Sequence, residues 1–544
     1  MDSLSRILLR LLLLVVIVFL LALLFFLYRC GCWGHPVPPG SDPGRGDRPL
    51  SQVSVEPGRT SGHQYPPFKT PTDEFNEDRA RSVPTGPLRG TLAPTRQGSQ
   101  LQPMPPPGSG GGAAVEFTGF NSLGTSAGSV GTPPDMNAAR SGQVVMLSYN
   151  TNVLLSVDGT ATWTLLNPTT IFPSGPNKDA AGNLLDNGLC CDQVLQYVPQ
   201  IDRFIWLMQF CGSGTTGCLS GINRVRIASA SPQQIISSGG TSWTYWDVLS
   251  STFNLGTTTM DYPDLAVGDN FLYFSADAVG NGLLVARLPL SEIQNSQSLN
   301  IGYTTPSDSS VAYGGHLSQN TGNAVFWAGH NNNSQMRIFT MQEGSNQYSW
   351  RNVDIGSWPN GTISSIAKDG TTDWLQFLGT SFPGNAVLGL TRRTANEVWF
   401  AWTAAAGSGF KQAQVQIVEL DVSDYHVISQ WQIWNDNYAF AFPSLATNGQ
   451  GEVGISLAWG GNNDWGNHAV GFLGDFVVWF PEASDTAITR WGDYVSVRRN
   501  VPDSSMFDAS GYAVLKQTPP ATGSRFDPYY IQFGRPKTGG SPIH

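Results

Sequence analysis

Short hydrophobic runs alternate with polar turns from about residue 135 to residue 536. The runs are rich in β-branched and aromatic residues, and Gly, Asn and Asp separate them at the spacing of strands. No long helical period interrupts the pattern, which therefore predicts an all-β domain. The clearest runs are 204–210, 283–288, 324–327, 397–402, 414–420 and 476–480.

A recurring strand opening, in which a small turn precedes an apolar strand, indicates repeated units. Comparable openings start at Pro134, Cys191, Tyr262, His316, Ala386, Phe442 and Trp491. Units of roughly 50 to 70 residues with about four strands each suit the blades of a β-propeller, because every blade buries its faces against its neighbours. We predict a seven-bladed β-propeller over 134–536. Six blades and a pair of β-sandwiches are the alternatives.

The N-terminal region carries one almost unbroken apolar run, Ile7 to Tyr28, interrupted only by Arg10. It is about as long as the ~20 residues that cross a bilayer. Arg6 and Arg10 favour a cytoplasmic N-terminus. We predict a cytoplasmic tip and transmembrane signal-anchor helix over 1–29, with the globular domain at the cell surface or in the lumen of the secretory pathway. A cleaved signal and the reverse topology are alternatives.

Between the apolar run and the repeats, residues 30–133 are dominated by Pro, Gly and Ser. Such a composition offers too little apolar surface to offset the entropy of the chain. We predict a disordered stalk over 30–133 and a disordered tail over 537–544.

The charge balance excludes some partners. The formal net charge is −10 and no basic stripe is present, so the chain lacks the footprint that nucleic acids require. The seven histidines show no ligand spacing, and we predict no catalytic transition metal and no organic cofactor.

Four cysteines lie close together in the sequence of the repeat region: Cys190, Cys191, Cys211 and Cys218. Four cysteines allow three pairings. The loop between Cys211 and Cys218 favours their pairing, which leaves Cys190 and Cys191 as a vicinal bridge or as free thiols. A zinc site is the rival interpretation, although the usual CxxC spacing is missing.

Polar residues recur where the predicted blades begin. The innermost strands of a propeller line its axis, so residues at their starts gather at one rim. Carboxylates there suit Ca²⁺ or acid–base chemistry, whereas the alternative is that each aspartate only stabilises its own turn. The candidate rim residues are Asp135, Asp192, Gln193, Tyr262, Asp264, His316, Trp459, Arg490, Trp491 and Asp493.

The segment Ser156-Val-Asp-Gly-Thr-Ala-Thr-Trp163 resembles an Asp-box, the hairpin motif of sialidase-like BNR-repeat propellers. Gly159 lies one place before the glycine of the motif, while Asp158, Thr162 and Trp163 match it. The Cys190-Cys-Asp-Gln193 and Arg490-Trp-Gly-Asp-Tyr494 segments are similar to those of secreted propellers related to sialidases. The resemblance implies the propeller fold and a structural role for the Asp-box, and it supplies no catalytic residue.

Together these features predict a membrane-anchored, surface-exposed propeller that binds a glycan or a protein at its axial face. The alternative function is a sialidase-like glycoside hydrolase or polysaccharide lyase that uses the axial carboxylates. Asn332 and Asn360 begin N-glycosylation sequons, which require an outward-facing domain for their use.

Overall fold

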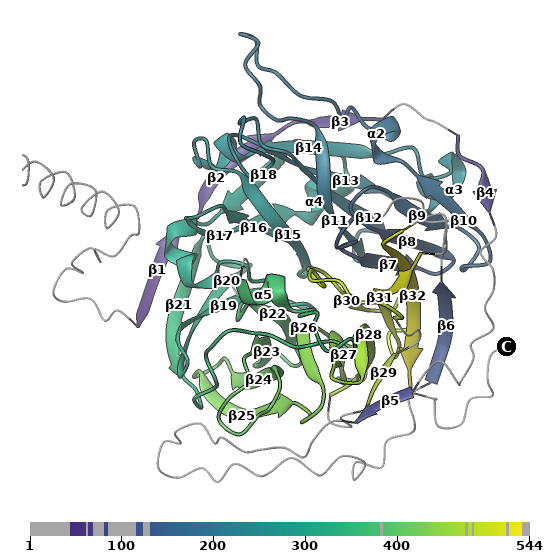
Figure 1. The fold of residues 1–544 in the computed structure, drawn as a ribbon. Coiled ribbons are helices and arrows are strands. Elements are labelled where there is room, and N and C mark those ends of the chain that lie inside the picture. Colours follow the sequence, from purple (N-terminus) through teal and green to yellow (C-terminus); the bar gives the residue numbers. More distant parts are fainter. Residues whose placement is uncertain are drawn as a thin grey trace, which may run out of the picture. The chain divides into compact units, whose positions relative to one another are not determined.

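Seven antiparallel sheets, each one blade, surround a central axis (Figure 1). The computed structural model describes residues 44–60, 64–68, 81–84, 116–122, 131–380, 384–473, 477–480, 484–517 and 522–535. Its contacts divide the chain into Met1–Gly46 and Asp47–His544, and the second unit holds the propeller. The seven-bladed prediction is confirmed, and the six-bladed and sandwich alternatives are wrong.

The first three blades each contain five strands. Blade 1 consists, from the axis outward, of β7 (Asn137–Ser141), β8 (Val144–Ser148), β9 (Val153–Ser156), β10 (Trp163–Leu166) and β4 (Pro67–Phe68). Blade 2 consists of β11 (Leu189–Val198), β12 (Arg203–Phe210), β13 (Arg224–Ala230), β14 (Thr244–Leu249) and β3 (Pro57–Arg59). Blade 3 consists of β15 (Met260–Val267), β16 (Phe271–Ala278), β17 (Gly282–Pro289), β18 (Leu299–Tyr303) and β2 (Ser51–Val55).

The other four blades complete the ring. Blade 4 consists of β19 (Ala324–Asn332), β20 (Gln335–Gln342), β21 (Gln347–Asp354) and β1 (Arg45–Pro49). Blade 5 consists of β22 (Val387–Arg392), β23 (Glu397–Ala404), β24 (Gln414–Asp421) and β25 (His426–Ile433). Blade 6 consists of β26 (Ala439–Thr447), β27 (Val453–Gly461), β28 (Asp464–Phe472), β29 (Val477–Phe480) and β5 (Arg81–Pro84). Blade 7 consists of β30 (Ser496–Arg499), β31 (Phe507–Lys516), β32 (Ser524–Gly534) and β6 (Glu116–Ser122).

The innermost position of blade 4 is occupied by an extended segment, 316–319, instead of a regular strand. Ser318 N donates to the carbonyl oxygen of Phe326 in β19 at 2.9 Å, and His316 N donates to that of Val387 in β22 at 3.0 Å. The segment therefore links blades 4 and 5. With it, all seven predicted strand openings lie at or next to the inner edge of a blade.

The core lies between the blades, where both faces of most strands are covered. Every residue of β27 is buried, for example, which explains why strands here read as continuous apolar runs instead of alternating ones. Large aromatic side chains fill the spaces between the sheets. The tryptophans with the least exposure are Trp163, Trp206, Trp246, Trp327, Trp374, Trp402, Trp459 and Trp491.

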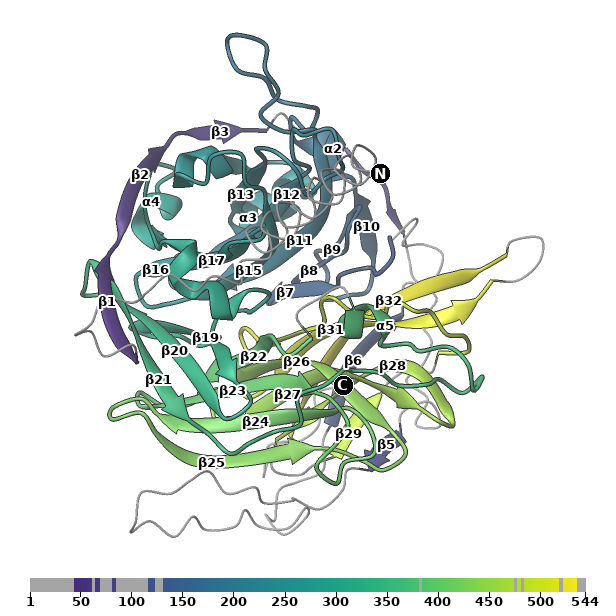
Figure 2. The same cartoon turned by 60° about the vertical axis from the view of Figure 1, so that its left-hand side comes forward.

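Strands from the Pro/Gly-rich region form the outer edges of six blades, so the prediction of a disordered stalk is wrong for the described parts of 30–133. The order of the strands β1 to β4 follows blades 4, 3, 2 and 1, opposite to the order of the blades in the chain. Figure 2 shows β2 and β3 following one another along this edge. Ser51–Val55 pairs with β18 over five residues, and its Val53 and Val55 pack against the core. We call β1 to β5 the belt. β6 differs, because it supplies the fourth strand of blade 7 and closes the ring.

Helices are short and lie in the connections. They are α2 (Pro168–Ile171), α3 (Pro232–Ser238), α4 (Leu290–Gln294), α5 (Gln376–Thr380) and the 3₁₀ turns η2 (Ser250–Phe253) and η3 (Pro306–Ala312). α3 starts with a capping box of Ser231 and Gln234. α5 belongs to the long connection between blades 4 and 5.

Among the described residues, no helix has the length and hydrophobicity needed to cross a bilayer. The predicted anchor helix at 7–28, the cytoplasmic tip and the tail at 537–544 all lie outside the described residues.

Candidate functional site

The inner strands run in the same direction around the axis, so residues at their starts gather at one end of the central channel. Parallel bridges between neighbouring inner segments, Gly268 with Gly322 and Gln319 with Thr391, record this common direction. Four carboxylates from four consecutive blades meet at the starting end, which we call the acid end. They are Asp135 of blade 1, Asp192 of blade 2, Asp261 of blade 3 and Asp493 of blade 7.

Hydrogen bonds hold the carboxylates of Asp135 and Asp261 in place. Asp135 accepts from Asn150 Nδ2 at 2.6 Å and from the backbone N of Asp493 at 3.1 Å. Asp261 accepts from Gln209 Nε2 at 2.6 Å. The contact between Asp135 and Asp493 joins the first blade to the last.

A bulge separates two aspartates of β15 into different environments. The register with β16 shifts between Asp261 and Asp264, and Tyr262 between them has a φ of 53°. Bulges redirect side chains, and a tyrosine in the left-handed region is held there by its surroundings. As a result Asp261 lies among the carboxylates of the acid end, while Asp264 lines the interior of the channel. β26 repeats the arrangement at Phe442, with a φ of 52° and a register shift.

The four carboxylates are close enough to affect one another. Burial raises the pKa of Asp135 well above its ordinary value, and the negative charges of Asp493 and Asp192 raise it further. Burial also raises the pKa of Asp192 strongly, with added repulsion from Asp261 and Asp493. The pKa of Asp261 is raised for the same first reason, although the hydrogen bond from Gln209 opposes the shift. The acid end therefore holds repelling or shared-proton carboxyl groups.

Arg490 brings the opposite charge to this end. Its Nη2 lies 2.9 Å from Asp493 Oδ2, and its side chain is 44% exposed. The guanidinium lies over the ring of Phe377, 4.1 Å from the ring centre. Burial raises the pKa of Asp493 in spite of this cation. Asp493 Oδ1 is buried and has no hydrogen-bond partner in the described part of the chain.

Three rings close the channel beneath the acid end. His316 stacks on Tyr262 at 4.9 Å between ring centres and on Tyr494 at 5.6 Å. The Tyr262 hydroxyl donates to the carbonyl oxygen of Asp493 at 2.9 Å, and the Tyr494 hydroxyl lies 2.9 Å from the Pro263 oxygen and 3.2 Å from Asp192 Oδ2. The free space below these rings is about 10 Å³. A ligand at the acid end would therefore stay at the mouth.

The structure separates the predicted rim residues into two groups. Asp135, Asp192, Arg490 and Asp493 lie together at the acid end, with Tyr262 and His316 directly beneath them. Gln193 is buried between blades, where it donates to the Tyr149 oxygen and accepts from Trp206 Nε1. Asp264 lies deeper in the channel.

Two tryptophans predicted at the rim, Trp459 and Trp491, are buried instead. Trp459 is 1% exposed and packs in the core of blade 6 against Tyr438, so it lies away from the rim. Trp491 is also 1% exposed and stacks on Tyr512 beneath the rim. Neither presents a ring face to a ligand, because tryptophans fill the spaces between the blades.

Two residues of the acid end, Asp261 and Phe377, were not predicted from the sequence. Asp261 directly precedes the Tyr262 opening, and its place in the repeated unit was the available signal. Phe377 comes from α5 in the connection between blades 4 and 5, which has no counterpart in the repeats.

The Asp-box-like turn joins β9 and β10 in the outer part of blade 1. Asp158 accepts from Thr162 N at 2.9 Å and from Thr162 Oγ1 at 2.6 Å, and Ser156 Oγ accepts from Thr160 N at 2.8 Å. Trp163 is buried. The turn includes Gly159 with a φ of 71°. Because it joins outer strands of blade 1 while the axial carboxylates lie at the inner edge, its role is structural.

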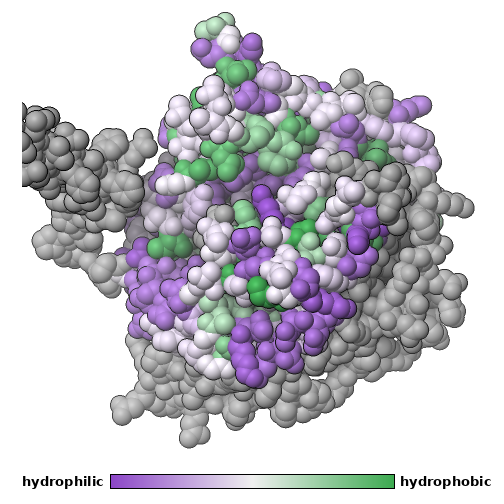
Figure 3. Space-filling model, in the orientation of Figure 1, coloured by the Kyte–Doolittle hydropathy of each residue, from purple (hydrophilic) through white to green (hydrophobic). Residues whose placement is uncertain are grey.

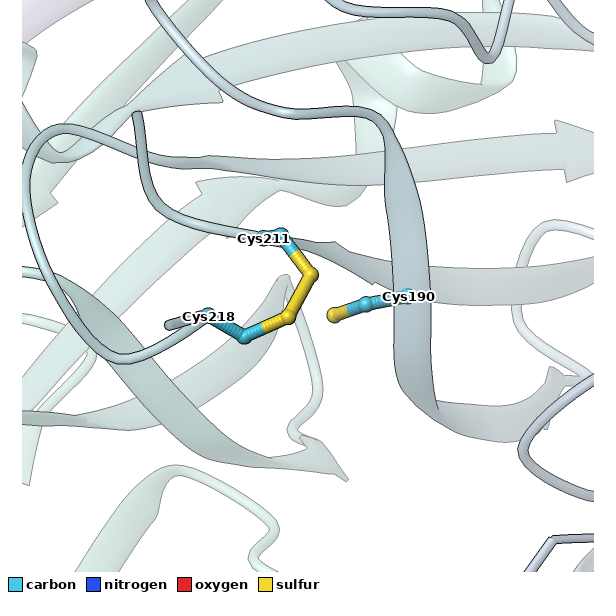
Figure 4. Close-up of side chains that lie close together, drawn as sticks. All are labelled: Cys190, Cys211 and Cys218. Atoms are coloured by element: carbon cyan, nitrogen blue, oxygen red, sulfur yellow. A yellow bond between two sulfur atoms is a disulfide. The ribbon is translucent and has the colours of Figure 1, made fainter. Parts of the chain in front are cut away.

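The four cysteines form two disulfides, Cys190–Cys191 and Cys211–Cys218. Figure 4 shows the Cys190 sulfur pointing toward the Cys211–Cys218 bridge, and the three sulfur atoms of Cys190, Cys211 and Cys218 lie within 4.8 Å of one another. Disulfide sulfurs are not the thiolates that zinc requires, so the pairing excludes the zinc interpretation for this state. The vicinal bridge directly precedes Asp192.

Both sequon asparagines are exposed. Asn332 lies at the end of β19, and Asn360 lies in the connection that carries α5. Figure 3 shows hydrophilic and hydrophobic residues interspersed over the face seen in Figure 1.

Comparisons with known proteins add only distant structural likenesses. No family model matches this chain, and no curated protein matches it. An α-L-arabinofuranosidase of Fusarium graminearum in complex with an iminosugar inhibitor is 12% identical, covers 74% of this chain and 93% of its own, and has a TM-score of 0.33. A Trypanosoma rangeli sialidase in complex with 2,3-difluorosialic acid is 10% identical, covers 64% and 53%, and has a TM-score of 0.31. An α-L-arabinanase of Penicillium chrysogenum with arabinobiose is 10% identical, covers 73% and 93%, and has a TM-score of 0.33. Sialidase and arabinanase propellers are thus among the structures that this chain resembles, at a distance that carries no argument about activity.

Proposed function

We propose that this protein binds a glycan at the acid end of its propeller. The observation that carries the proposal is the convergence of Asp135, Asp192, Asp261 and Asp493, with the buried Oδ1 of Asp493 unpartnered. A buried acceptor without a donor is unfavourable, and repelling carboxylates gain from any ligand that donates hydrogen bonds. Sugar hydroxyls are such donors.

The surroundings of the carboxylates suit a sugar ring. Arg490 can donate to a ring oxygen or to a carboxylate of an acidic sugar. Phe377 brings an aromatic ring to the same end, and aromatic rings pack well against the apolar face of a sugar. Ligand sites commonly combine such apolar surface with a few placed polar groups.

A glycan array probed with the purified full-length chain tests this proposal. We expect saturable binding, and Asp192→Asn should weaken it by about tenfold or more because a charge-assisted hydrogen bond is lost. Asp354→Asn, at an exposed position on β21, is the matched control and should bind like the wild type. Absence of binding across the array, or equal loss in both variants, would reject the proposal. In that case a surface protein becomes the expected partner.

A glycoside hydrolase is the second candidate, with a polysaccharide lyase as its variant. One observation favours it: carboxyl groups with strongly raised pKa values, Asp135 and Asp192, lie beside Asp493, whose charge Arg490 balances. Environments that differ in this way allow one group to act as an acid and another as a base. The bound glycan should then be cleaved, and Asp192→Asn should reduce turnover by roughly 100-fold or more. Intact glycan recovered by mass spectrometry after prolonged incubation would exclude this candidate.

Ca²⁺ is a further proposed occupant of the acid end, since it prefers oxygen ligands. Ca²⁺ should raise the melting temperature, and chelation should reverse the increase.

We also propose that residues 7–28 anchor the chain in a membrane with the propeller outside. Protease protection of the anchor segment and accessibility of the propeller in intact cells test that topology.

A further inference from the structure

The opposite end of the channel contains a polar cavity of about 260 Å³. It lies where the inner strands end, and blades 2, 3, 4, 6 and 7 contribute to its lining. Two adjacent arginines of blade 7 face amide side chains of blades 2 and 4 across it. The residues that matter for the argument are Gln196, Gln319, Asn320, Arg498 and Arg499, and we call this cavity the arginine pocket.

Arg498 is a buried cation with unused hydrogen-bonding capacity. Its side chain is 9% exposed, and its Nη2 lies 3.7 Å from Asp264 Oδ1. Nη1 donates to the Val497 oxygen at 3.2 Å. Nε is buried and has no partner in the described part of the chain. Arginines keep their charge at such sites, so this guanidinium gains from an anionic acceptor.

Arg499 extends the positive charge toward solvent. It is exposed, and its Nε donates to the Thr447 oxygen at 2.9 Å, which fixes the base of the guanidinium. Its two Nη atoms have no hydrogen-bond partner within the described residues. The two adjacent arginines thus offer unpartnered guanidinium nitrogens, Nε of Arg498 and both Nη atoms of Arg499, and guanidinium groups of this kind bind oxyanions.

The amides show what else the pocket can recognise. Gln319 Nε2 donates to the Leu265 oxygen at 2.8 Å, and Asn320 Oδ1 accepts from Thr447 N at 2.9 Å. Gln196 Oε1 is buried and has no partner among the described residues. The unpartnered acceptor Gln196 Oε1 can accept from a hydroxyl group of a ligand, and the unpartnered arginine nitrogens can donate to its oxyanion. The pocket therefore suits a ligand that carries both groups.

We propose that the arginine pocket binds a small hydroxylated oxyanion, held at its carboxylate or phosphate by Arg498 and Arg499 and at a hydroxyl by Gln196. This site is separate from the glycan site of the acid end, because the stacked rings of Tyr262, His316 and Tyr494 fill the channel between them. Asp269, exposed at the edge of the pocket, disfavours ligands that carry a second anion on that side.

Titration calorimetry on the purified full-length chain tests the proposal with glucuronate, inorganic phosphate and neutral glucose as probes. We expect saturable binding of at least one of the two anions and none of glucose. Arg499→Gln should weaken anion binding by about tenfold or more. Stronger binding of glucuronate assigns a hydroxy acid, whereas stronger binding of phosphate assigns a phosphoryl group.

Two further variants keep the test decisive. Arg351→Gln removes an arginine on β21 of blade 4 that stacks on Tyr425, and its anion affinity should equal that of the wild type. Gln196→Leu should weaken glucuronate binding while changing the affinity for phosphate less. The proposal is overturned if neither anion binds saturably, or if Arg499→Gln and Arg351→Gln bind alike. The test relies on Arg499→Gln and not on Arg498→Gln, because Arg499 is exposed and its replacement should leave the fold intact, whereas Arg498 is buried.

Discussion

The two ends of the central channel are built by the same strands and have opposite chemistry. At the acid end, four carboxylates share one partly exposed cation, Arg490. At the other end, the buried Arg498 has one carboxylate, Asp264, at 3.7 Å and a second cation, Arg499, beside it. Because the inner strands share one direction, residues that recur at strand starts and strand ends collect at different ends of the axis. The common direction of the inner strands therefore places negative charge at one end of the channel and positive charge at the other.

The two ends also differ in how they affect the stability of the fold. Like charges at the acid end repel, so that end should reduce the stability of the fold and gain from a ligand. The pair of Arg498 and Asp264 is charge-balanced and should support the fold. Replacing a carboxylate at the acid end should therefore raise the stability of the fold, whereas replacing Arg498 should lower it.

The largest effect should follow from Arg498→Gln. It leaves Asp264, whose side chain is 5% exposed, without its opposite charge, and breaking such a buried pair lowers the free energy of unfolding by about 3 kcal/mol. Denaturant titration measures the change. Adding Asp264→Asn should recover part of the loss, and an unchanged or higher stability in Arg498→Gln would contradict the charge balance at that end.

Asp192→Asn should act in the opposite direction. It removes one of the repelling carboxylates while keeping the side chain's shape, and we expect the free energy of unfolding at neutral pH to rise by about 1 kcal/mol. The Tyr494 hydroxyl can still donate to the amide oxygen. Asp354→Asn is the control, with a change within about 0.5 kcal/mol. A loss of stability in Asp192→Asn would mean that its charge supports the fold.

The gain from Asp192→Asn should depend on pH. The folded wild type holds protons at Asp192 and Asp135 more tightly than the unfolded chain, because their pKa values are raised. The stabilisation that the wild type gains from protonating these two carboxyl groups is fully present below the ordinary carboxyl pKa of about 4. It is lost as the pH rises through their raised pKa values in the folded state. The difference between variant and wild type should therefore shrink as the pH falls toward about 4. Comparing the two proteins cancels the buried histidines, whose lowered pKa values act in the reverse direction. A difference that stays constant with pH would contradict the raised values.

Arg490→Gln should have the smallest effect. The cation is 44% exposed, and exposed ion pairs contribute about 0.5 kcal/mol. The loss should diminish in high salt and at acidic pH, where Asp493 is neutral. A salt-independent loss above about 1 kcal/mol would indicate that Arg490 supports the fold through Phe377 instead.

The sequence predicted the ring and most of the acid end, because repeated strand openings carry both. Asp135, Asp192 and Asp493 each follow a predicted opening, and the topology of a propeller turns that repetition into proximity. Trp459 and Trp491 could not be assigned in the same way, since a tryptophan between two sheets and a tryptophan at a rim have the same sequence pattern.

Two other features required the structure. Phe377 reaches the acid end through an insertion that breaks the repeat. The pairing of the belt with the blades was not predicted, because the Pro/Gly-rich composition of the belt shows only that it cannot form a hydrophobic core by itself. The exposed edges of β18 and β14 supply the hydrogen-bonding partners that segments such as Ser51–Val55 lack by themselves.

The closing strand β6 also sets an order of events during synthesis. It leaves the ribosome before any blade, yet its partner β32 is the last strand to emerge. Until then, blade 7 has no outer strand and the nascent ring remains open at an unpaired edge, which is a site for association with other chains. A chain truncated before residue 524 would therefore be expected to require chaperones and to be degraded, even with six complete blades.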